Sequence, residues 1–192
     1  TPALTHVGGG GSSRAELIVN GTGASDGSPG RIIAYDPLTG GELWSVRGTS
    51  DIPCPTAIIA EDIVVCTSGS TSGGKRPVTA IRAGGEGDVT GTHVMWQVAN
   101  AGPPVPTGLV LNGRLPPRTD GGVAACYRRK DGTRLWKERL CEAFTASLVA
   151  AGDHVDAGQG VVDGAGEGGQ AVGAAGGGRL GGVGGGLFGE VD

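Results

Sequence analysis

This sequence lacks the patterns that would point to a membrane span, a nucleic acid or a metal. No apolar run approaches the length of about 18 residues that a transmembrane helix needs. The net charge is −4 and no Lys/Arg cluster occurs, which argues against nucleic acid as a partner. The four cysteines, Cys54, Cys66, Cys126 and Cys141, form no C-x-x-C pair, so zinc is not indicated. We expect buried free thiols, with a Cys54–Cys66 disulfide as the alternative.

Aromatic residues are scarce, at 4 %, whereas glycine accounts for 41 of the 192 residues. The glycine excess is concentrated at one end, since 16 of the 35 residues over 158–192 are glycine. Such a Gly/Ala/Val composition without alternation cannot bury enough apolar surface to offset the entropy of ordering. The sequence therefore predicts a folded unit over residues 1–155 and a Gly-rich low-complexity tail over residues 156–192. The tail is either a disordered linker or the product of a frame-shift artefact.

The most informative stretch runs from residue 30 to residue 46. Residues 30–35 form a short β-branched run bounded by turn formers, which favours a strand. A turn follows, in which the Asp36 side chain can accept hydrogen bonds from the next amides and Gly40 can adopt a positive φ. Residues 42–46 alternate polar and apolar side chains, as a half-buried return strand does. The stretch predicts a β-hairpin.

Two landmarks indicate that this unit is repeated. Trp44, Trp96 and Trp136 are separated by 52 and 40 residues. The second landmark is a Thr or Ser that precedes an apolar run, a tight turn and a further strand. It occurs at Thr56, Thr107 and Ser147, which are spaced by 51 and 40 residues. Two independent landmarks with nearly the same step indicate a true internal repeat.

Each repeat unit predicts two hairpins, or four short strands, in about 40–50 residues, which is the period of a β-propeller blade. The predicted blades cover residues 1–47, 49–99 and 103–138, and a fourth opens at residue 144. In the third, Asn112-Gly113 is the favoured type I′ hairpin turn. Helical periodicity is absent. The predicted fold is therefore all-β, a partial β-propeller of four-stranded blades with about three to four blades of a larger ring.

Because a propeller needs at least about four blades to close, we expect the chain to be a fragment of a longer protein. The start at Thr1, with neither an initiator Met nor a signal-like segment, fits that expectation.

At the pattern A-x-D-x-x-x-G-x-x-x-W the chain resembles the PQQ-like (quinoprotein-type) propeller repeats. The segments 85–96 and 144–147 resemble the BamB-like repeat proteins common in planctomycete-type bacteria. Ala34, Asp36, Gly40 and Trp44 match this tryptophan-docking motif completely, and Trp96, Gly132 and Trp136 match it in part. The resemblance implies that each tryptophan stacks between blades against the peptide of the motif glycine in the adjacent copy. A large apolar ring and a glycine that permits close approach make this a structural role.

The later copies depart from the motif. The second has Arg82 in place of the aspartate and six extra residues in its turn. The third has Cys126 and Arg128 in place of the alanine and the aspartate. Two prolines, at positions 116 and 117, fall where a strand is expected, and they would remove two hydrogen-bond donors from it.

No catalytic, cofactor-binding or metal-binding residue is predicted. The many acidic residues fall at turn positions, where Asp is expected for structural reasons. The resemblance implies a non-catalytic scaffold that binds a protein or an envelope component, in a bacterial periplasm or outside the cell. The alternative is a fragment of a PQQ-dependent alcohol or sugar dehydrogenase. That alternative alone would require PQQ and Ca²⁺, with the ion held by carboxylate and amide oxygens beside an Asp base. The third option is that the chain is the product of a pseudogene and has no function.

Overall fold

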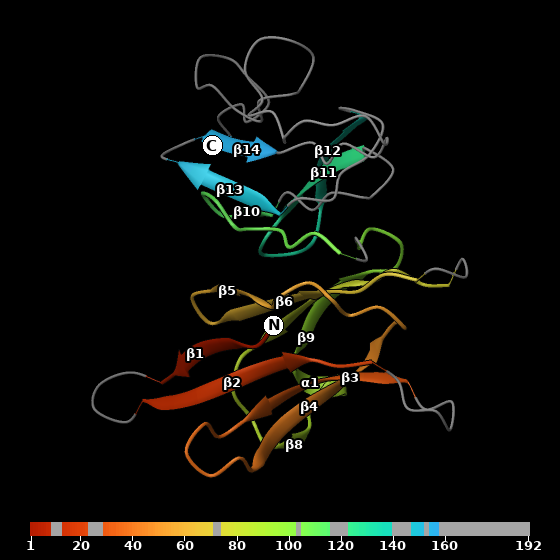
Figure 1. The fold of residues 1–192 in the computed structure, drawn as a ribbon. Coiled ribbons are helices and arrows are strands. Elements are labelled where there is room, and N and C mark those ends of the chain that lie inside the picture. Colours follow the sequence, from red (N-terminus) through yellow and green to blue (C-terminus); the bar gives the residue numbers. More distant parts are fainter. Residues whose placement is uncertain are drawn as a thin grey trace, which may run out of the picture.

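The computed structural model describes residues 1–8, 13–22, 29–70, 74–102, 105–115, 123–139, 147–151 and 154–157. Within these ranges, one short helix accompanies strands that form four separate sheets (Figure 1). The all-β prediction is thereby confirmed. Cys141 and the prolines at 116 and 117 lie outside the described residues. Of the tail predicted over residues 156–192, residues 158–192 also lie outside them, and the first two residues end a short strand.

The sheets follow one another along the chain, and their antiparallel strands lie in sequence order. The first sheet, which we call blade one, contains β1 (Ala3–Val7), β2 (Arg14–Asn20), β3 (Gly30–Tyr35) and β4 (Glu42–Thr49). Blade two contains β5 (Ile58–Ala60), β6 (Ile63–Thr67), β7 (Val78–Arg82) and β9 (Val94–Val98). Blade three contains β10 (Arg114–Leu115), β11 (Val123–Arg128) and β12 (Arg134–Arg139). The fourth sheet pairs β13 (Leu148–Ala151) with β14 (His154–Ala157).

The extra residues in the second copy of the motif give blade one a fifth strand. They form β8 (Gly87–Asp88), which pairs in parallel with β4, and α1 (Thr90–His93). Gly84, Gly85 and Gly87 all have positive φ, which lets the chain turn back toward blade one. Blade one therefore departs from the predicted four strands. The helix of four residues is too short to leave a periodic signal in the sequence.

The first strand expected in blade three is reduced to a single bridge between Leu111 and Arg114. Pro106 has no amide proton and Gly108 has no side chain to pack, and both weaken a strand there. The tight turn that follows is as predicted: Asn112 and Gly113 have φ values of 49° and 69°. Two positive φ values are the requirement of a type I′ turn, so this prediction is confirmed.

Within the described residues, the core consists of two layers, each between successive blades. The first layer joins Ile18, Ile32, Ala34, Trp44 and Val46 of blade one to Ala57, Val64, Cys66, Ile81, Ala83 and Val89 of blade two. The second joins Ile58, Ile63, Val65, Val78, Ala80, Trp96 and Ala101 of blade two to Leu115, Ala125 and Tyr127 of blade three. Each blade thus buries the apolar face of its neighbour, as stacked blades of a propeller do.

Candidate functional site: the blade junctions and the cleft of blade one

The three motif tryptophans occupy equivalent places in three sheets. Each lies on the last antiparallel strand of its blade, directly opposite a small residue of the preceding strand. The pairs are Ala34 with Trp44, Ala80 with Trp96, and Cys126 with Trp136. In every copy the register shifts just after the small residue, so the same β-bulge recurs. The repeat found in the sequence is therefore a repeat of backbone geometry.

Asp36 and Gly40 shape the hairpin turn of blade one. The Gly40 amide donates to the Asp36 carbonyl oxygen at 2.8 Å, and the Leu38 amide donates to Asp36 Oδ1 at 2.8 Å. Gly40 has a φ of +75°, which favours glycine. The hydrogen bond from Leu38 is the main reason that the pKa of the Asp36 carboxyl is lowered. The aspartate thus fixes the turn.

Blade three builds the same turn although Arg128 replaces the aspartate. The Gly132 amide donates to the Arg128 carbonyl oxygen at 2.9 Å, and Gly132 has a φ of +70°. Asp131 takes over the side-chain role, since the Thr133 amide donates to Asp131 Oδ1 at 2.9 Å. This bond, with a further contribution from Arg128, lowers the pKa of Asp131 to about 2. In the third copy, Asp131 therefore compensates for the aspartate that Arg128 replaces, three residues earlier in the chain.

At the junction of blades two and three, the Trp96 indole lies against Gly132. A Cβ added to Gly132 would lie 2.7 Å from Trp96 Cδ2 and Cε3, so this position has no room for a side chain. The indole Nε1 donates to the carbonyl oxygen of Arg129 at 2.8 Å. Trp96 is 9 % exposed. Here a tryptophan of one blade contacts the motif glycine of the next.

The junction of blades one and two is built differently, around a buried carboxylate. Trp44 and Glu16 are both 0 % exposed, and Trp44 Nε1 donates to Glu16 Oε2 at 2.8 Å. The Gly84 amide of blade two donates to the same oxygen at 3.3 Å. Arg14 pairs with Glu16 Oε1 at 2.6 Å and also donates to the Gly85 carbonyl oxygen at 3.1 Å. Glu16 therefore connects the indole of one blade to the backbone of the next.

The sequence interpretation missed Glu16. The sequence did contain a signal for it: Glu16 is the one charged residue in the otherwise apolar run of residues 15–19. A glutamate on the core face of a strand needs partners, because an unpaired buried charge is strongly unfavourable.

The Thr/Ser landmarks also connect blades. The Thr56 amide donates to Thr107 Oγ1 at 3.0 Å, and the Thr107 amide donates to Ser147 Oγ at 3.1 Å. Thr56 precedes β5 and Ser147 precedes β13, and these first strands follow β1 from bottom to top in Figure 1. The landmark that revealed the repeat in the sequence therefore has a physical role, since the Thr107 and Ser147 hydroxyls each accept a hydrogen bond from the preceding unit.

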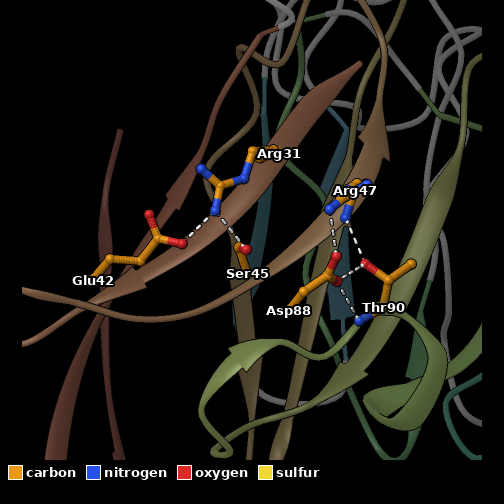
Figure 2. A network of polar contacts seen from close by, with 6 residues as sticks. All are labelled: Arg31, Glu42, Ser45, Arg47, Asp88 and Thr90. Carbon is orange, nitrogen blue, oxygen red and sulfur yellow. Dashed lines mark hydrogen bonds and ion pairs between the residues drawn. The ribbon is translucent and has the colours of Figure 1, made fainter. Parts of the chain in front are cut away.

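A polar cleft of about 390 Å³ lies on the sheet of blade one where β8 joins it. Its described lining residues are Pro29, Arg31, Glu42, Ser45, Arg47, Gly87 and Asp88. Figure 2 shows its polar side chains: Arg31 pairs with Glu42 and donates to Ser45 Oγ at 2.6 Å. Arg47 pairs with Asp88 at 2.8 Å. Both arginines of the cleft are thus neutralised by carboxylates within it.

Thr90, at the start of α1, orients the second of these pairs. Its amide and its hydroxyl donate to Asp88 Oδ1 at 3.1 and 2.6 Å, while the Arg47 amide donates to Thr90 Oγ1 at 3.0 Å (Figure 2). The side-chain hydrogen bond from Thr90 is the largest cause of the lowered pKa of Asp88. The carboxylate is therefore held as an anion in a fixed orientation.

The cysteines within the described residues are free thiols: Cys66 and Cys126 are buried and Cys54 is exposed. The Cys54–Cys66 disulfide considered as an alternative is therefore not formed, and the expectation of burial is confirmed for two of these three. Burial raises the pKa of Cys66 to about 12 and that of Cys126 to about 11. Such thiols are unreactive at neutral pH, because the thiolate is the nucleophile.

Two features are absent from the described part of the chain. No three His, Cys, Asp or Glu side chains lie together there in a way that could hold a metal ion. No helix there has the length and apolar character needed to cross a membrane.

Sheets that follow one another in chain order and pack face to face define a partial β-propeller. Residues 28–180 match the model of the family described as "Outer membrane protein assembly factor BamB". This match covers more than half of the chain, so the chain belongs to that family, and the predicted PQQ-like, BamB-like identity is confirmed. The match extends beyond residue 155, the predicted end of the folded unit.

The solved structures that are similar to the chain include two bacterial proteins. One is BamB from Moraxella catarrhalis, with a TM-score of 0.48 and 11 % identity over 80 % of this chain and 39 % of that one. The other is the quinohemoprotein alcohol dehydrogenase ADHIIG from Pseudomonas putida HK5, with a TM-score of 0.51 and 12 % identity over 84 % of this chain and 34 % of that one. The second similarity concerns the fold alone. No curated protein sequence matches the chain significantly.

Proposed function

We propose that the chain is part of a non-catalytic β-propeller scaffold of the bacterial envelope, where it binds a protein component. Membership of a family described as an outer membrane protein assembly factor supports both the location and the role. The location proposed is the periplasm or the outside of the cell. In this proposal the seven motif residues, Ala34, Asp36, Gly40, Trp44, Trp96, Gly132 and Trp136, hold blades together and contact no substrate.

The observation that carries the proposal is the network of Figure 2. Its two arginines and two carboxylates pair with one another, and Thr90 fixes the orientation of Asp88. Side chains already held in place lose little further freedom when a partner binds, which favours recognition. The pKa of Asp88 is lowered below its already acidic ordinary value, so this carboxyl is ionised at neutral pH. A general base works best with a pKa near the operating pH, so recognition suits this cleft better than proton transfer.

The dehydrogenase alternative requires a Ca²⁺ ion held by several carboxylate and amide oxygens. The described residues do not fit such a site by themselves, since their acidic side chains lie at separate turns or pair with arginines. The dehydrogenase alternative can be tested by adding quinone and Ca²⁺ to the purified chain.

The test of the proposal places a photo-crosslinking residue at position 29, where the exposed Pro29 lines the cleft. A matched variant carries the same group at Leu38, which is 94 % exposed and does not line the cleft. In the source cells we expect a discrete adduct with an envelope protein from position 29 and none from position 38. Equal labelling from both positions would contradict a specific surface. Saturable quenching of tryptophan fluorescence by added quinone with Ca²⁺, together with dye reduction, would replace the scaffold by the dehydrogenase.

A further inference from the structure

A second cleft, of about 290 Å³, lies between blade two and blade three. Its described lining residues are Arg76, Val98, Asn100 and Ala101 from blade two, and Val123, Ala125, Tyr127, Arg134 and Lys137 from blade three. Three of these side chains are cationic, and none of these described lining residues is acidic. The second cleft is therefore positively charged, although the chain as a whole carries a net charge of −4.

The backbone brings these cations together. In the register of β11 and β12, Tyr127 lies opposite Arg134 and Ala125 opposite Lys137. Residues directly opposite each other in a sheet share a face, so Arg134 and Lys137 lie on the face that carries Tyr127. Arg76 comes from blade two, where its amide donates to the Ala99 carbonyl oxygen and its own carbonyl accepts from the Ala101 amide, both at 3.0 Å.

Among the described residues, these three cations form no ion pair with a carboxylate. The ion pairs found there involve Arg14, Arg31, Arg47, Arg128 and Arg129. Arg76, Arg134 and Lys137 take part in none of these pairs. Like charges around one cleft repel one another, and an anionic ligand relieves that repulsion.

The rest of the cleft is apolar. Val98 and Val123 are half-buried, Ala101 and Ala125 are buried, and Tyr127 is 5 % exposed. A small hydrated anion would leave this surface unused. Guanidinium groups match the two oxygens of a carboxylate, and the apolar wall suits an aliphatic side chain.

We propose that this second cleft binds an acidic segment of the partner protein, in which carboxylate side chains flank an apolar one. The carboxylates pair with Arg76, Arg134 and Lys137, and the apolar side chain packs against Val123, Ala125 and Tyr127. The inference rests on the proposed scaffold function, because it gives the chemistry of the protein that the scaffold binds.

The test uses the full chain and a fluorescein-labelled peptide of alternating glutamate and leucine, with binding followed by fluorescence anisotropy. The variant combines Arg134→Gln and Lys137→Gln; both side chains are exposed, and circular dichroism checks that the sheets remain. Matched controls are Lys130→Gln and the double variant Lys75→Gln/Lys130→Gln, which remove one and two exposed cations outside the cleft. We expect saturable binding that weakens by about tenfold in the cleft variant and by less than about twofold in both controls. Added salt should weaken it further.

Four results would overturn the inference. They are no saturable binding to the full chain, equal binding of the peptide with glutamine in place of glutamate, unchanged affinity in the cleft variant, and full displacement of the peptide by an equal concentration of inorganic phosphate. The scaffold function is tested separately by the adduct from position 29. If that adduct forms and the peptide does not bind, the assignment of the second cleft fails alone. If the purified chain shows quinone-dependent dye reduction, the scaffold function fails whatever the peptide does.

Discussion

The two blade junctions bury equivalent tryptophans in different ways. At the first, the Trp44 indole donates to the buried Glu16 carboxylate of its own blade, which also accepts from Gly84 of blade two. At the second, the Trp96 indole donates to a backbone carbonyl of blade three and lies against Gly132. The same motif position therefore serves a polar, charge-assisted junction in one place and a close backbone contact in the other.

The difference follows from the turns. The second copy of the motif has six extra residues, and Gly84 to Val89 lie where the short turn of the third copy has Gly132. The longer turn places β8 beside β4, with the Val89 amide donating to the Ser45 carbonyl oxygen at 2.9 Å. A turn insertion has thus added strand pairing to the first junction, and the described residues of the second junction show no such pairing.

The largest expected effect comes from removing a tryptophan. Trp44→Ala should lower the free energy of unfolding by about 3–5 kcal/mol, and Trp96→Ala by somewhat less, because Trp44 is fully buried and bonds a charged acceptor. Urea unfolding followed by circular dichroism measures both. If the alanine variants do not fold, Trp44→Phe and Trp96→Phe provide the same comparison with smaller losses. A larger loss at Trp96 would contradict the view that Glu16 makes the first junction the stronger one.

A glycine substitution separates backbone strain from contact with the indole. Gly132→Ala would place its Cβ 2.7 Å from the Trp96 ring at a φ of +70°. Gly40→Ala, the equivalent change in blade one, has a φ of +75° and would meet no described atom within 4 Å. We expect Gly40→Ala to cost about 1–2 kcal/mol from strain, and Gly132→Ala about 1–3 kcal/mol more from the displaced indole. Equal losses in urea unfolding would show that the indole does not depend on this glycine.

The sequence predicted much of this arrangement from a few residues. The positive φ of Gly40, the turn at Asn112-Gly113 and the all-β class were each inferred from local chemistry, and the structure agrees. These features depend on near neighbours in the chain, where turn and strand preferences act directly.

Other features could not be predicted, because they depend on contacts between distant residues. Glu16 and Gly84 are 68 residues apart in the sequence, and nothing local indicates that they meet. The return of β8 to blade one, and the cations that gather between blades two and three, likewise depend on how neighbouring blades pack. The candidate clefts are for this reason products of tertiary structure.

Loss of the buried carboxylate should have an intermediate effect. Glu16→Gln removes the charge that Arg14 pairs with and weakens the acceptor for Trp44 and Gly84. We expect a loss of about 1–3 kcal/mol in the free energy of unfolding, since charged hydrogen-bond partners are left poorly paired. The control is Glu42→Gln in the half-exposed pair with Arg31, where a loss of about 0–1 kcal/mol is expected. Similar losses at both sites would contradict the central place of Glu16 at the first junction.

The smallest expected effect concerns the turn that presents Gly132 to Trp96. The pKa of Asp131 is lowered from 3.8 to about 2, so the folded state favours the ionised carboxyl. Its contribution to stability is present above about pH 4 and is lost as the pH falls through about 2. Asp131→Asn removes this titration, so its melting temperature should decline less than that of the unmodified chain between pH 5 and pH 2. Identical declines would mean that the Asp131 carboxyl does not stabilise the turn, and that Gly132 is held by the backbone bond to Arg128.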